Sequence, residues 1–360
     1  MSRSGKPTVI TGGAGFIGSN LADRLLSSGR EVVILDNLSR PGVEKNLDWL
    51  KERHGALVSA VMADVRDERA VNEAIAEASA VFHFAAQVAV TTSLVRPIED
   101  FEVNARGTLN VLEAIRSAAA KGAAPPLVFT STNKVYGGLP DVRLTKVSGR
   151  YEPEDPGLRA HGVGEDRPLD FHSPYGCSKG AADQYVIDYA RTFGIPAVVL
   201  RMSCIYGPRQ FGTEDQGWVA HFLFRAAQGA PITLYGDGMQ VRDVLFVEDL
   251  VEAFLAAERN IENLSGRAFN IGGGVSNTLS LLELVDRIGH LMGSPPAVSF
   301  SAWRPGDQRY YVSSTRSFGE ATGWCPKVSV REGIERLHRW VLQAERARRP
   351  ERALETASAL

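Results

Sequence analysis

The feature that most constrains the fold is an apolar strand, a glycine-rich turn and a helix that follow one another near the N-terminus. Thr8 to Thr11 runs into Gly12-Gly13-Ala14-Gly15-Phe16-Ile17-Gly18, and leucines then recur at helical spacing. Gly12 permits a tight turn, Gly15 lets a diphosphate approach the backbone, and Gly18 lets the helix pack on the strand. This order predicts a dinucleotide-binding turn whose helix amides face a diphosphate.

The ends of the next two strands indicate the same kind of ligand. A strand over Glu31 to Leu35 ends in Asp36, whose carboxylate can accept hydrogen bonds from an adenosine ribose and would repel a 2′-phosphate. NAD is therefore favoured over NADP. A third strand is predicted over Leu57 to Met62, and Asp64 beyond it either contacts the adenine or caps the next helix. Asp36 has an alternative interpretation as the cap of a turn.

Two further strands end in small or hydroxyl-bearing residues. Val81 to Ala86 is apolar enough to be buried on both faces, and its last two alanines, Ala85 and Ala86, leave room for a cofactor. The strand from Leu127 ends at Thr132, whose hydroxyl is expected in the ligand-binding region of an open α/β sheet. Asn104 opens a predicted helix, and it either caps that helix or braces the backbone near the site.

Repeated strand–helix units predict a right-handed, doubly wound parallel sheet of the α/β class, a Rossmann-type fold. We expect this domain to cover residues 1–200, with 241–265 returning to it, and a smaller C-terminal substrate-binding lobe to cover 201–345. The stretch from Gly137 to Phe171 is rich in Pro, Gly and charge, and we interpret it as a flap over a sugar site. Residues 346–360 are expected to form a solvated tail.

The segment Ser173-Pro174-Tyr175-Gly176-Cys177-Ser178-Lys179 carries the expected chemistry. Pro174 suits a first helical turn, so Tyr175 and Lys179 share one helix face. A phenol ionises near pH ~10, but a close ammonium favours the phenolate and lowers its pKa. The pair predicts a general base for a sugar hydroxyl. An ordinary helix with an exposed lysine and a half-buried tyrosine is the alternative.

Composition excludes several classes of partner. The 360 residues are 44% hydrophobic and 23% charged, as in ordinary globular proteins. A formal net charge of −2 gives no reason to expect nucleic acid or an anionic membrane as partner. Cys177, Cys204 and Cys325 lack metal-ligand spacing and are odd in number, so neither a metal site nor a disulfide framework is expected. Without a membrane-spanning apolar run or a secretory signal, a cytoplasmic protein is the default expectation.

The glycine turn, Asp36, Thr132, Tyr175 and Lys179 occur together in the order of one enzyme family. The chain resembles the extended short-chain dehydrogenases/reductases, nucleotide-sugar branch, over about residues 7–342. The run from Leu169 to Tyr185 carries this resemblance most specifically, together with Thr132-Asn133-Lys134-Val135-Tyr136-Gly137 and Tyr206-Gly207-Pro208-Arg209. Within the branch the chain is most similar to the CDP-sugar 2-epimerases, which implies CDP-paratose as substrate, CDP-tyvelose as product and NAD as cofactor.

The resemblance also implies roles for single residues. Tyr175 would be the base, Lys179 would adjust its pKa and bind a ribose, and Thr132 would contact a substrate hydroxyl. The implied NAD-binding residues are Gly12, Gly15, Phe16, Ile17, Gly18, Asp36, Asn37, Ser39, Arg40, Asp64, Val65, Ala85, Ala86, Gln87, Asn104, Thr130, Tyr175 and Lys179. The implied substrate-binding residues are Thr132, Asn133, Cys204, Arg209, Gln210, Tyr235, Arg242 and Asp307.

Two of the implied substrate-binding residues have alternative interpretations, and a third differs from many relatives. Arg242 matches an arginine that binds the diphosphate, for which a guanidinium fork is well suited, with a helix-face salt bridge as the alternative. Tyr235 would stack on the nucleotide base, or it would be an aromatic residue at a strand end. Cys204 stands where many relatives have asparagine.

Several functions stay open within this resemblance. Sugar-nucleotide 4,6-dehydratases carry Asp-Glu directly after the catalytic threonine, whereas this chain has Asn133 and Lys134, so dehydration is not expected. A UDP-sugar 4-epimerase, another NDP-deoxysugar oxidoreductase and a non-catalytic scaffold are the alternatives. Relatives are usually homodimers or homotetramers built through two helices, here 104–120 and 174–192.

Overall fold

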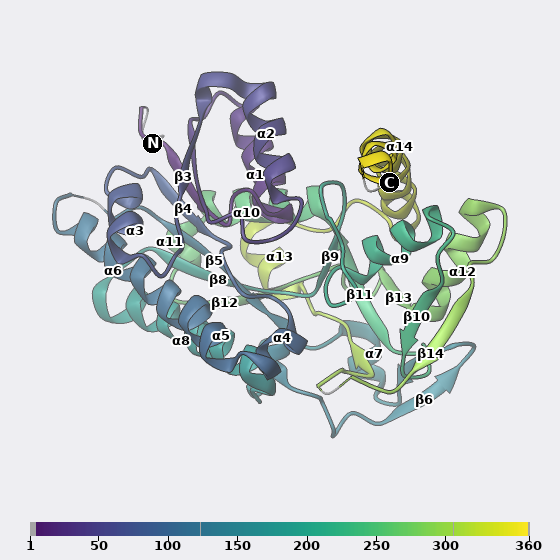
Figure 1. The fold of residues 1–360 in the computed structure, drawn as a ribbon. Coiled ribbons are helices and arrows are strands. Elements are labelled where there is room, and N and C mark those ends of the chain that lie inside the picture. The colour runs from purple at the N-terminus through teal and green to yellow at the C-terminus, as the bar shows by residue number, and fades with distance from the viewer. Residues whose placement is uncertain (1–4, 123, 305, 359–360) are drawn as a thin grey trace.

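A parallel sheet of seven strands forms the centre of the molecule, in the order β12-β8-β5-β4-β1-β2-β3 (Figure 1). The computed structural model describes residues 5–122, 124–304 and 306–358, and the side chains of those up to residue 346. In chain order the strands are β1 (Thr8–Thr11), β2 (Val32–Asp36), β3 (Val58–Met62), β4 (Ala80–His83), β5 (Leu127–Thr132), β8 (Ala197–Met202) and β12 (Ala268–Ile271). This arrangement confirms the predicted doubly wound α/β fold.

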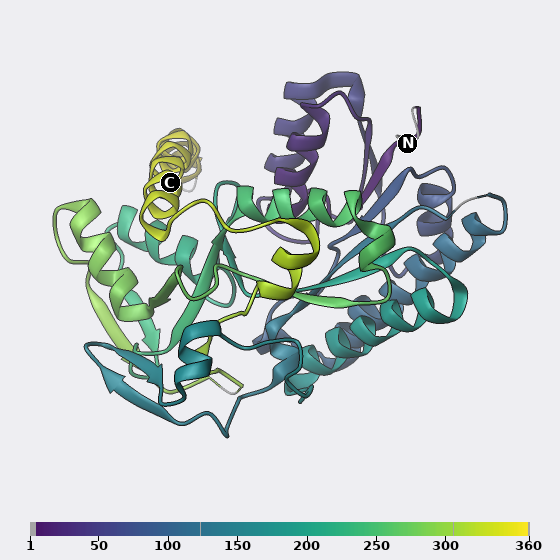
Figure 2. The ribbon, with the colours of Figure 1, turned by 180° about the vertical axis from the view of Figure 1, so that it is seen from behind.

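Helices cover both faces of this sheet, because successive residues of a strand point to opposite sides. Ile10 packs into the core on one face and Val9 into the core on the other. The first face is covered by α1 (Phe16–Leu26), α2 (Val43–His54), α10 (Val247–Arg259), α11 (Ile261–Leu264) and α13 (Arg316–Thr322). The second is covered by α3 (Glu68–Ile75), α6 (Gly107–Ala119) and α8 (Ser173–Phe193). Figures 1 and 2 show these two helical layers from opposite sides.

A smaller lobe lies beside the sheet and has its own core (Figure 1, right). Its strand β11 (Val241–Phe246) pairs with β9 (Cys204–Tyr206), β13 (Thr278–Ser280) and β15 (Tyr310–Tyr311). A separate pair is formed by β10 (Ile232–Tyr235) and β14 (Val298–Ser301). The helices of this lobe are α9 (Trp218–Ala227), α12 (Leu281–Met292) and α14 (Val330–Ser358). Its sheet and helices bury apolar side chains against one another, including Phe246, Leu223 and Leu337.

The chain passes between the lobes more often than the sequence indicated. Within the stretch 241–265, β11 belongs to the sheet of the smaller lobe, whereas α10 and α11 lie on the seven-stranded sheet. Residues 268–271 then form β12, which pairs with β8 at the edge of the large sheet, and α13 packs near it. Both returns lie within 201–345, which the sequence assigns mainly to the smaller lobe. Because β12 is only four residues long, it gives a weak signal in the sequence.

The predicted flap is an ordered connection attached to the smaller lobe. It contains the hairpin β6 (Leu144–Val147) and β7 (Arg150–Pro153), followed by α7 (Pro156–His161). Tyr151 N donates to Met239 O at 2.9 Å, and Arg150 Nη1 donates to Glu283 at 3.1 Å.

The predicted tail, 346–360, continues α14 as a helix to Ser358, and its side chains from 347 onward lie outside the described residues. Among the helices that the structure describes, none is both long and apolar enough to cross a membrane.

Candidate active site

The strand order of the large sheet reverses between β1 and β4, the point at which ligands bind in open α/β sheets. Thr11 pairs with His83 there, so both strands end at the same level. The glycine turn follows β1: Gly12 has a φ of 68°, and a Cβ on it would lie 2.7 Å from Ala85 N. Only glycine allows the turn to approach the end of β4 this closely.

The same turn fits the diphosphate of NAD. A Cβ on Gly18 would lie 2.3 Å from Gly12 O, so glycine is needed for α1 to pack against the turn. Gly15 is the N-cap of α1 and supplies no side-chain cap, which leaves the first-turn amides around Phe16 and Ile17 without a side-chain acceptor. Such amides bind phosphate oxygens through hydrogen bonds and the helix dipole.

The residues predicted for the adenosine half gather at the ends of β2 and β3. Asp36 accepts hydrogen bonds from Ala14 N at 3.0 Å and Leu38 N at 2.9 Å, while burial raises its pKa. Asn37 Nδ2 donates to Asp64 at 2.8 Å, and Asn37 Oδ1 accepts from Ser39 N at 3.1 Å.

Three of the residues predicted to bind NAD already contact other residues of the protein: Asp64, Arg40 and Val65. Arg66 binds the Asp64 carboxylate through two nitrogens and lowers the pKa of Asp64 to about 2. Arg40 donates to Gln216 of the smaller lobe, and Val65 is buried under Gly107 of α6.

Asn104 lies in the middle of a helical stretch and braces the chain after β4. That stretch comprises α5 (Pro97–Phe101), a π-helical turn η2 (Glu102–Arg106) and α6, with α4 (Val90–Val95) before it. Asn104 Oδ1 accepts from Gln87 N at 2.9 Å, and its Nδ2 donates to Gln87 O at 3.0 Å. The predicted helix start and N-cap at Asn104 are therefore wrong, because the helix begins at Pro97; the alternative bracing role agrees with these contacts. Half-buried Ala85 and Ala86 precede Gln87, and Thr130 Oγ1 donates to His83 O at 3.2 Å.

Sequence reasoning missed Asp100, which connects these elements. Its fully buried carboxylate accepts from Gln87 Nε2 at 2.7 Å, from Asn104 Nδ2 at 3.2 Å and from the hydroxyl of Ser178 on α8. Burial raises the pKa of Asp100 above its ordinary value. The available signal was its position, one helical turn before Asn104 and three residues after Pro97.

Tyr175 and Thr132 meet at the ends of α8 and β5. Pro174 stands in the first turn of α8, as predicted, which places Tyr175 at the sheet end of the helix. The Tyr175 phenol approaches the Thr132 side chain, which lowers the pKa of Tyr175 against the larger opposing effect of burial. Thr132 also caps the short helix η3 (Asn133–Tyr136) by accepting from Lys134 N at 3.2 Å. The backbones of Tyr175 and Thr132 are thus both fixed, one in the first turn of α8 and the other as the cap of η3.

Lys179 lies one turn further along α8 and is buried, at 4% exposure. Its Nζ lies 4.3 Å from the centre of the Phe129 ring, and burial lowers its pKa to about 7. Burial also raises the pKa of Tyr175 to about 12, and the negative charge of Asp100 adds to this. The expectation that the pKa of Tyr175 is lowered is therefore wrong, because removal from water dominates at both groups.

Four predicted substrate residues form a polar cluster on the other side of Thr132. Arg242, only 7% of whose side chain is exposed, donates to Asp307 at 2.7 Å. Asn133 Nδ2 donates to the buried side chain of Gln308 at 3.3 Å. Cys204 accepts from Trp218 Nε1 at 3.5 Å, and its pKa is raised by burial and lowered by the charge of Arg242.

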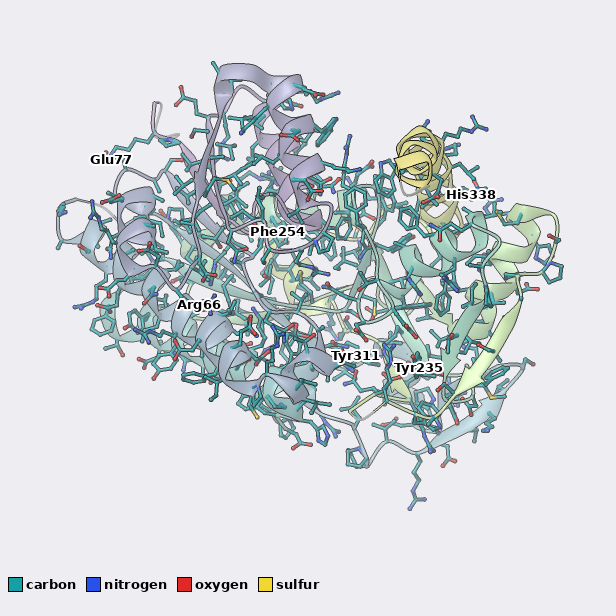
Figure 3. All side chains as sticks on the ribbon, in the orientation of Figure 1. Arg66, Glu77, Tyr235, Phe254, Tyr311 and His338 are labelled. Atoms are coloured by element: carbon teal, nitrogen blue, oxygen red, sulfur yellow. The ribbon has the colours of Figure 1, made fainter. Side chains whose placement is uncertain are left out.

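The other three predicted substrate residues make different contacts. The Arg209 guanidinium lies 3.6 Å from the centre of the Trp49 ring in α2, on the dinucleotide side. Gln210 is buried and donates to Ile205 O at 3.2 Å. Tyr235, labelled in Figure 3, is covered by the Arg304 guanidinium at 3.8 Å and donates to Glu214. In the described arrangement the ring face of Tyr235 is thus occupied by protein.

Known proteins resemble the chain in both sequence and fold. Residues 8–272 match the NAD dependent epimerase/dehydratase family. Over 339 residues the chain is 43% identical to the CDP-paratose 2-epimerase of Salmonella typhi, which covers 92% of this chain and 98% of that protein.

Solved structures of similar proteins cover nearly the whole fold. The UDP-glucose 4-epimerase of Thermotoga maritima, solved with UDP-glucose, has a TM-score of 0.80 and 30% identity over 94% of this chain and 99% of that one. The UDP-glucose 4-epimerase of Thermus thermophilus, solved with NAD, has a TM-score of 0.76 and 33% identity over 93% of this chain and 98% of that one.

Proposed function

Because the chain belongs to the NAD dependent epimerase/dehydratase family, we propose that it converts CDP-paratose to CDP-tyvelose by epimerisation at C2. The observation that carries the proposal is the approach of the Tyr175 phenol to the Thr132 side chain, with Lys179 one helical turn away on α8. A 43% identical relative with this activity supports the choice of sugar and of nucleotide.

Residues of both lobes would hold the two ligands. The glycine turn and the first turn of α1 would bind the NAD diphosphate, Asp36 the adenosine ribose, and Lys179 the nicotinamide ribose. Arg242 and Asp307 would bind the nucleotide sugar, whose pyranose would reach Thr132 and Tyr175. Bound NAD supplies a hydride acceptor that is regenerated in every turnover.

The protein's own part in the reaction is a proton transfer at the sugar 2-hydroxyl. Tyr175 would remove this proton as the C2 hydrogen leaves, and Thr132 would hold the same oxygen in place. The resulting 2-keto sugar turns within the site and is reduced on its other face, while Tyr175 returns the proton. A carbonyl at C4 could not achieve this, because it acidifies only C3 and C5. Asn133 and Lys134 stand where a dehydratase would need carboxyl groups.

Isotope labelling tests this route directly. CDP-paratose deuterated at C2 should give CDP-tyvelose that keeps the label at C2 by NMR, with no release of NADH. Tyr175→Phe should remove most turnover while NAD stays bound. Washout of deuterium into water would contradict hydride return, and full activity of Tyr175→Phe would show that another base operates.

A UDP-sugar 4-epimerase is the second candidate, because both similar solved structures carry that activity in their names. The same Tyr175, Thr132 and Lys179 could serve oxidation at C4. Incubation with UDP-glucose under identical conditions separates the two: formation of UDP-galactose without conversion of CDP-paratose would favour the 4-epimerase. Stoichiometric NADH production would instead indicate a net oxidoreductase of another NDP-deoxysugar.

A homodimer would cover an exposed apolar patch on α4, α5 and α8. The patch consists of Leu94, Val95, Ile98, Phe101, Tyr185 and Phe193, each at least 47% exposed. Large apolar side chains that are exposed on neighbouring helices are typical of a contact between subunits. Ile98→Glu should convert the assembly to monomers in sedimentation experiments, and an unchanged sedimentation coefficient would argue against this interface.

The three cysteines are free in the structure, which is consistent with a cytoplasmic location.

A further inference from the structure

Lys134 is a cation beside the reacting hydroxyls to which no role has been given. It follows Thr132 by two residues, and its backbone N donates to Thr132 Oγ1 at 3.2 Å, so its main chain is fixed relative to that hydroxyl. Its side chain is 21% exposed. The Nζ donates to Gly306 O at 3.2 Å. In the described part of the chain its one ion pair is with the Asp307 carboxylate, 3.9 Å away.

The charges around Lys134 do not balance. Arg242 holds the Asp307 carboxylate at 2.7 Å, while Lys134 Nζ stands 3.9 Å from the same carboxylate. Burial and, to a smaller extent, the charge of Arg242 lower the pKa of Lys134 to about 8, while Asp307 and Cys204 oppose the shift. Two cations thus share one carboxylate in a site that is largely withdrawn from water. An unbalanced cation there is costly unless an anion binds to it.

We propose that Lys134 binds the phosphate attached to the sugar, so that Lys134 and Arg242 together clamp the substrate diphosphate. This inference rests on the proposed nucleotide-sugar substrate. Such a substrate brings a doubly charged diphosphate directly behind the pyranose that contacts Thr132. Because the Lys134 backbone is held two residues after Thr132, we expect its ammonium to meet the sugar-linked phosphate, which leaves Arg242 for the rest of the diphosphate.

The contact has a consequence for epimerisation. The 2-keto sugar must turn over without leaving, so the fixed point during that movement is the diphosphate. A flexible ammonium can follow a phosphate oxygen through this movement, because it is a point charge with rotatable donors. Lys134 would therefore stabilise the bound substrate and the bound 2-keto sugar to the same degree. Its loss is then expected to raise KM more than it lowers kcat.

Binding of nucleotides without the sugar tests the proposal. Lys134→Gln, in the NAD-loaded enzyme, should weaken CDP binding by about 10–100-fold and leave CMP binding within about 3-fold, since loss of one charge-assisted hydrogen bond has this magnitude. The KM for the nucleotide sugar should rise in proportion, with kcat within about 3-fold. Lys134→Arg should restore most of the CDP affinity. Lys51→Gln removes an exposed positive charge in the last turn of α2, outside the proposed substrate site, and serves as the control.

Each outcome is informative because folding and NAD content are measured on the same samples. Unchanged CDP affinity in a folded, NAD-loaded Lys134→Gln would overturn the proposal. So would weaker binding of the nucleotide sugar without weaker binding of CDP, which would place the ammonium on a sugar hydroxyl. If wild-type protein bound neither CDP nor UDP, the proposed substrate class would fail instead, and the contact with it.

Discussion

At the scale of single residues, burial shifts the pKa values of the two central groups of the site in opposite directions, each toward the uncharged form. Near pH 8 Tyr175, with its pKa raised to about 12, keeps its proton, while Lys179, with its pKa lowered to about 7, has mostly lost its own. A positive charge near Tyr175 would favour the phenolate, and the nicotinamide ring of oxidised NAD carries such a charge. Activation of the base is therefore expected to depend on cofactor binding as well as on Lys179.

Replacement of Lys179 by methionine should stabilise the NAD-free protein at low pH. Below pH 7 folding buries the Lys179 charge, and methionine removes that cost. Between pH 7 and the ordinary lysine value of 10.5 the unfolded chain binds more protons than the folded one, so the wild-type free energy of unfolding rises with pH. Urea unfolding should show a gain from Lys179→Met that is about 3 kcal/mol larger at pH 6 than at pH 9.

The prediction concerns the difference between the gains in free energy of unfolding at pH 6 and at pH 9. At each pH the Lys179→Met variant is compared with wild type. An equal gain at both values would mean that Lys179 stays charged on folding, held by Asp100 and Asp183. Activity should fall at all pH values, since Lys179 lies beside the site that the cofactor occupies. Stability and function would then conflict at this residue, as is common for buried active-site charges.

At the scale of elements, local patterns were predictable and long-range polar contacts were not. Apolar strands, the glycine turn and Pro174 follow from spacing, and the structure places them as expected. The sequence predicts a helix start at Asn104 because polar residues favour helix caps. In the structure Asn104 lies in the π-helical turn η2, for which the sequence has no comparable signal. The partner of Asp100, Ser178, is 78 residues away, and only the packing of α5 against α8 brings them together.

Asp100→Asn should destabilise the contact between α5 and α8. The carboxylate accepts from Gln87, Asn104 and Ser178, whereas an asparagine offers one acceptor oxygen and directs an amide at the remaining donors. The free energy of unfolding should fall by about 1–3 kcal/mol, the cost of leaving buried groups unpaired. Glu99→Gln is the matched control, because Glu99 is the exposed neighbour of Asp100 in the same helix. Equal urea midpoints for the two variants would show that the carboxylate is dispensable.

At the scale of the whole molecule, the smaller lobe reaches back over the glycine turn. Pro208 O and Arg209 O accept hydrogen bonds from Asn20 of α1 and Asn46 of α2, at 3.0 and 3.3 Å. Asn46 Nδ2 also donates to Ala14 O at 3.1 Å, inside the turn itself. One buried amide thus ties the dinucleotide-binding turn to the loop that leads into the smaller lobe. The contact would hold the lobes together over the NAD diphosphate.

Asn46→Ala should therefore release NAD more readily. The change leaves the carbonyls of Ala14 and Arg209 without this donor, and the loop 207–216 is then free to lift from the turn. We expect the NAD dissociation constant to rise by about 10-fold, which corresponds to the loss of roughly 1.4 kcal/mol. NAD remaining after dialysis measures this. Asn260→Ala serves as the control. It removes an amide at the C-terminal end of α10 that donates to Ala256 O of the same helix at 2.8 Å, and it should keep wild-type NAD content. Equal retention in both variants would mean that the glycine turn holds the cofactor without help from the smaller lobe.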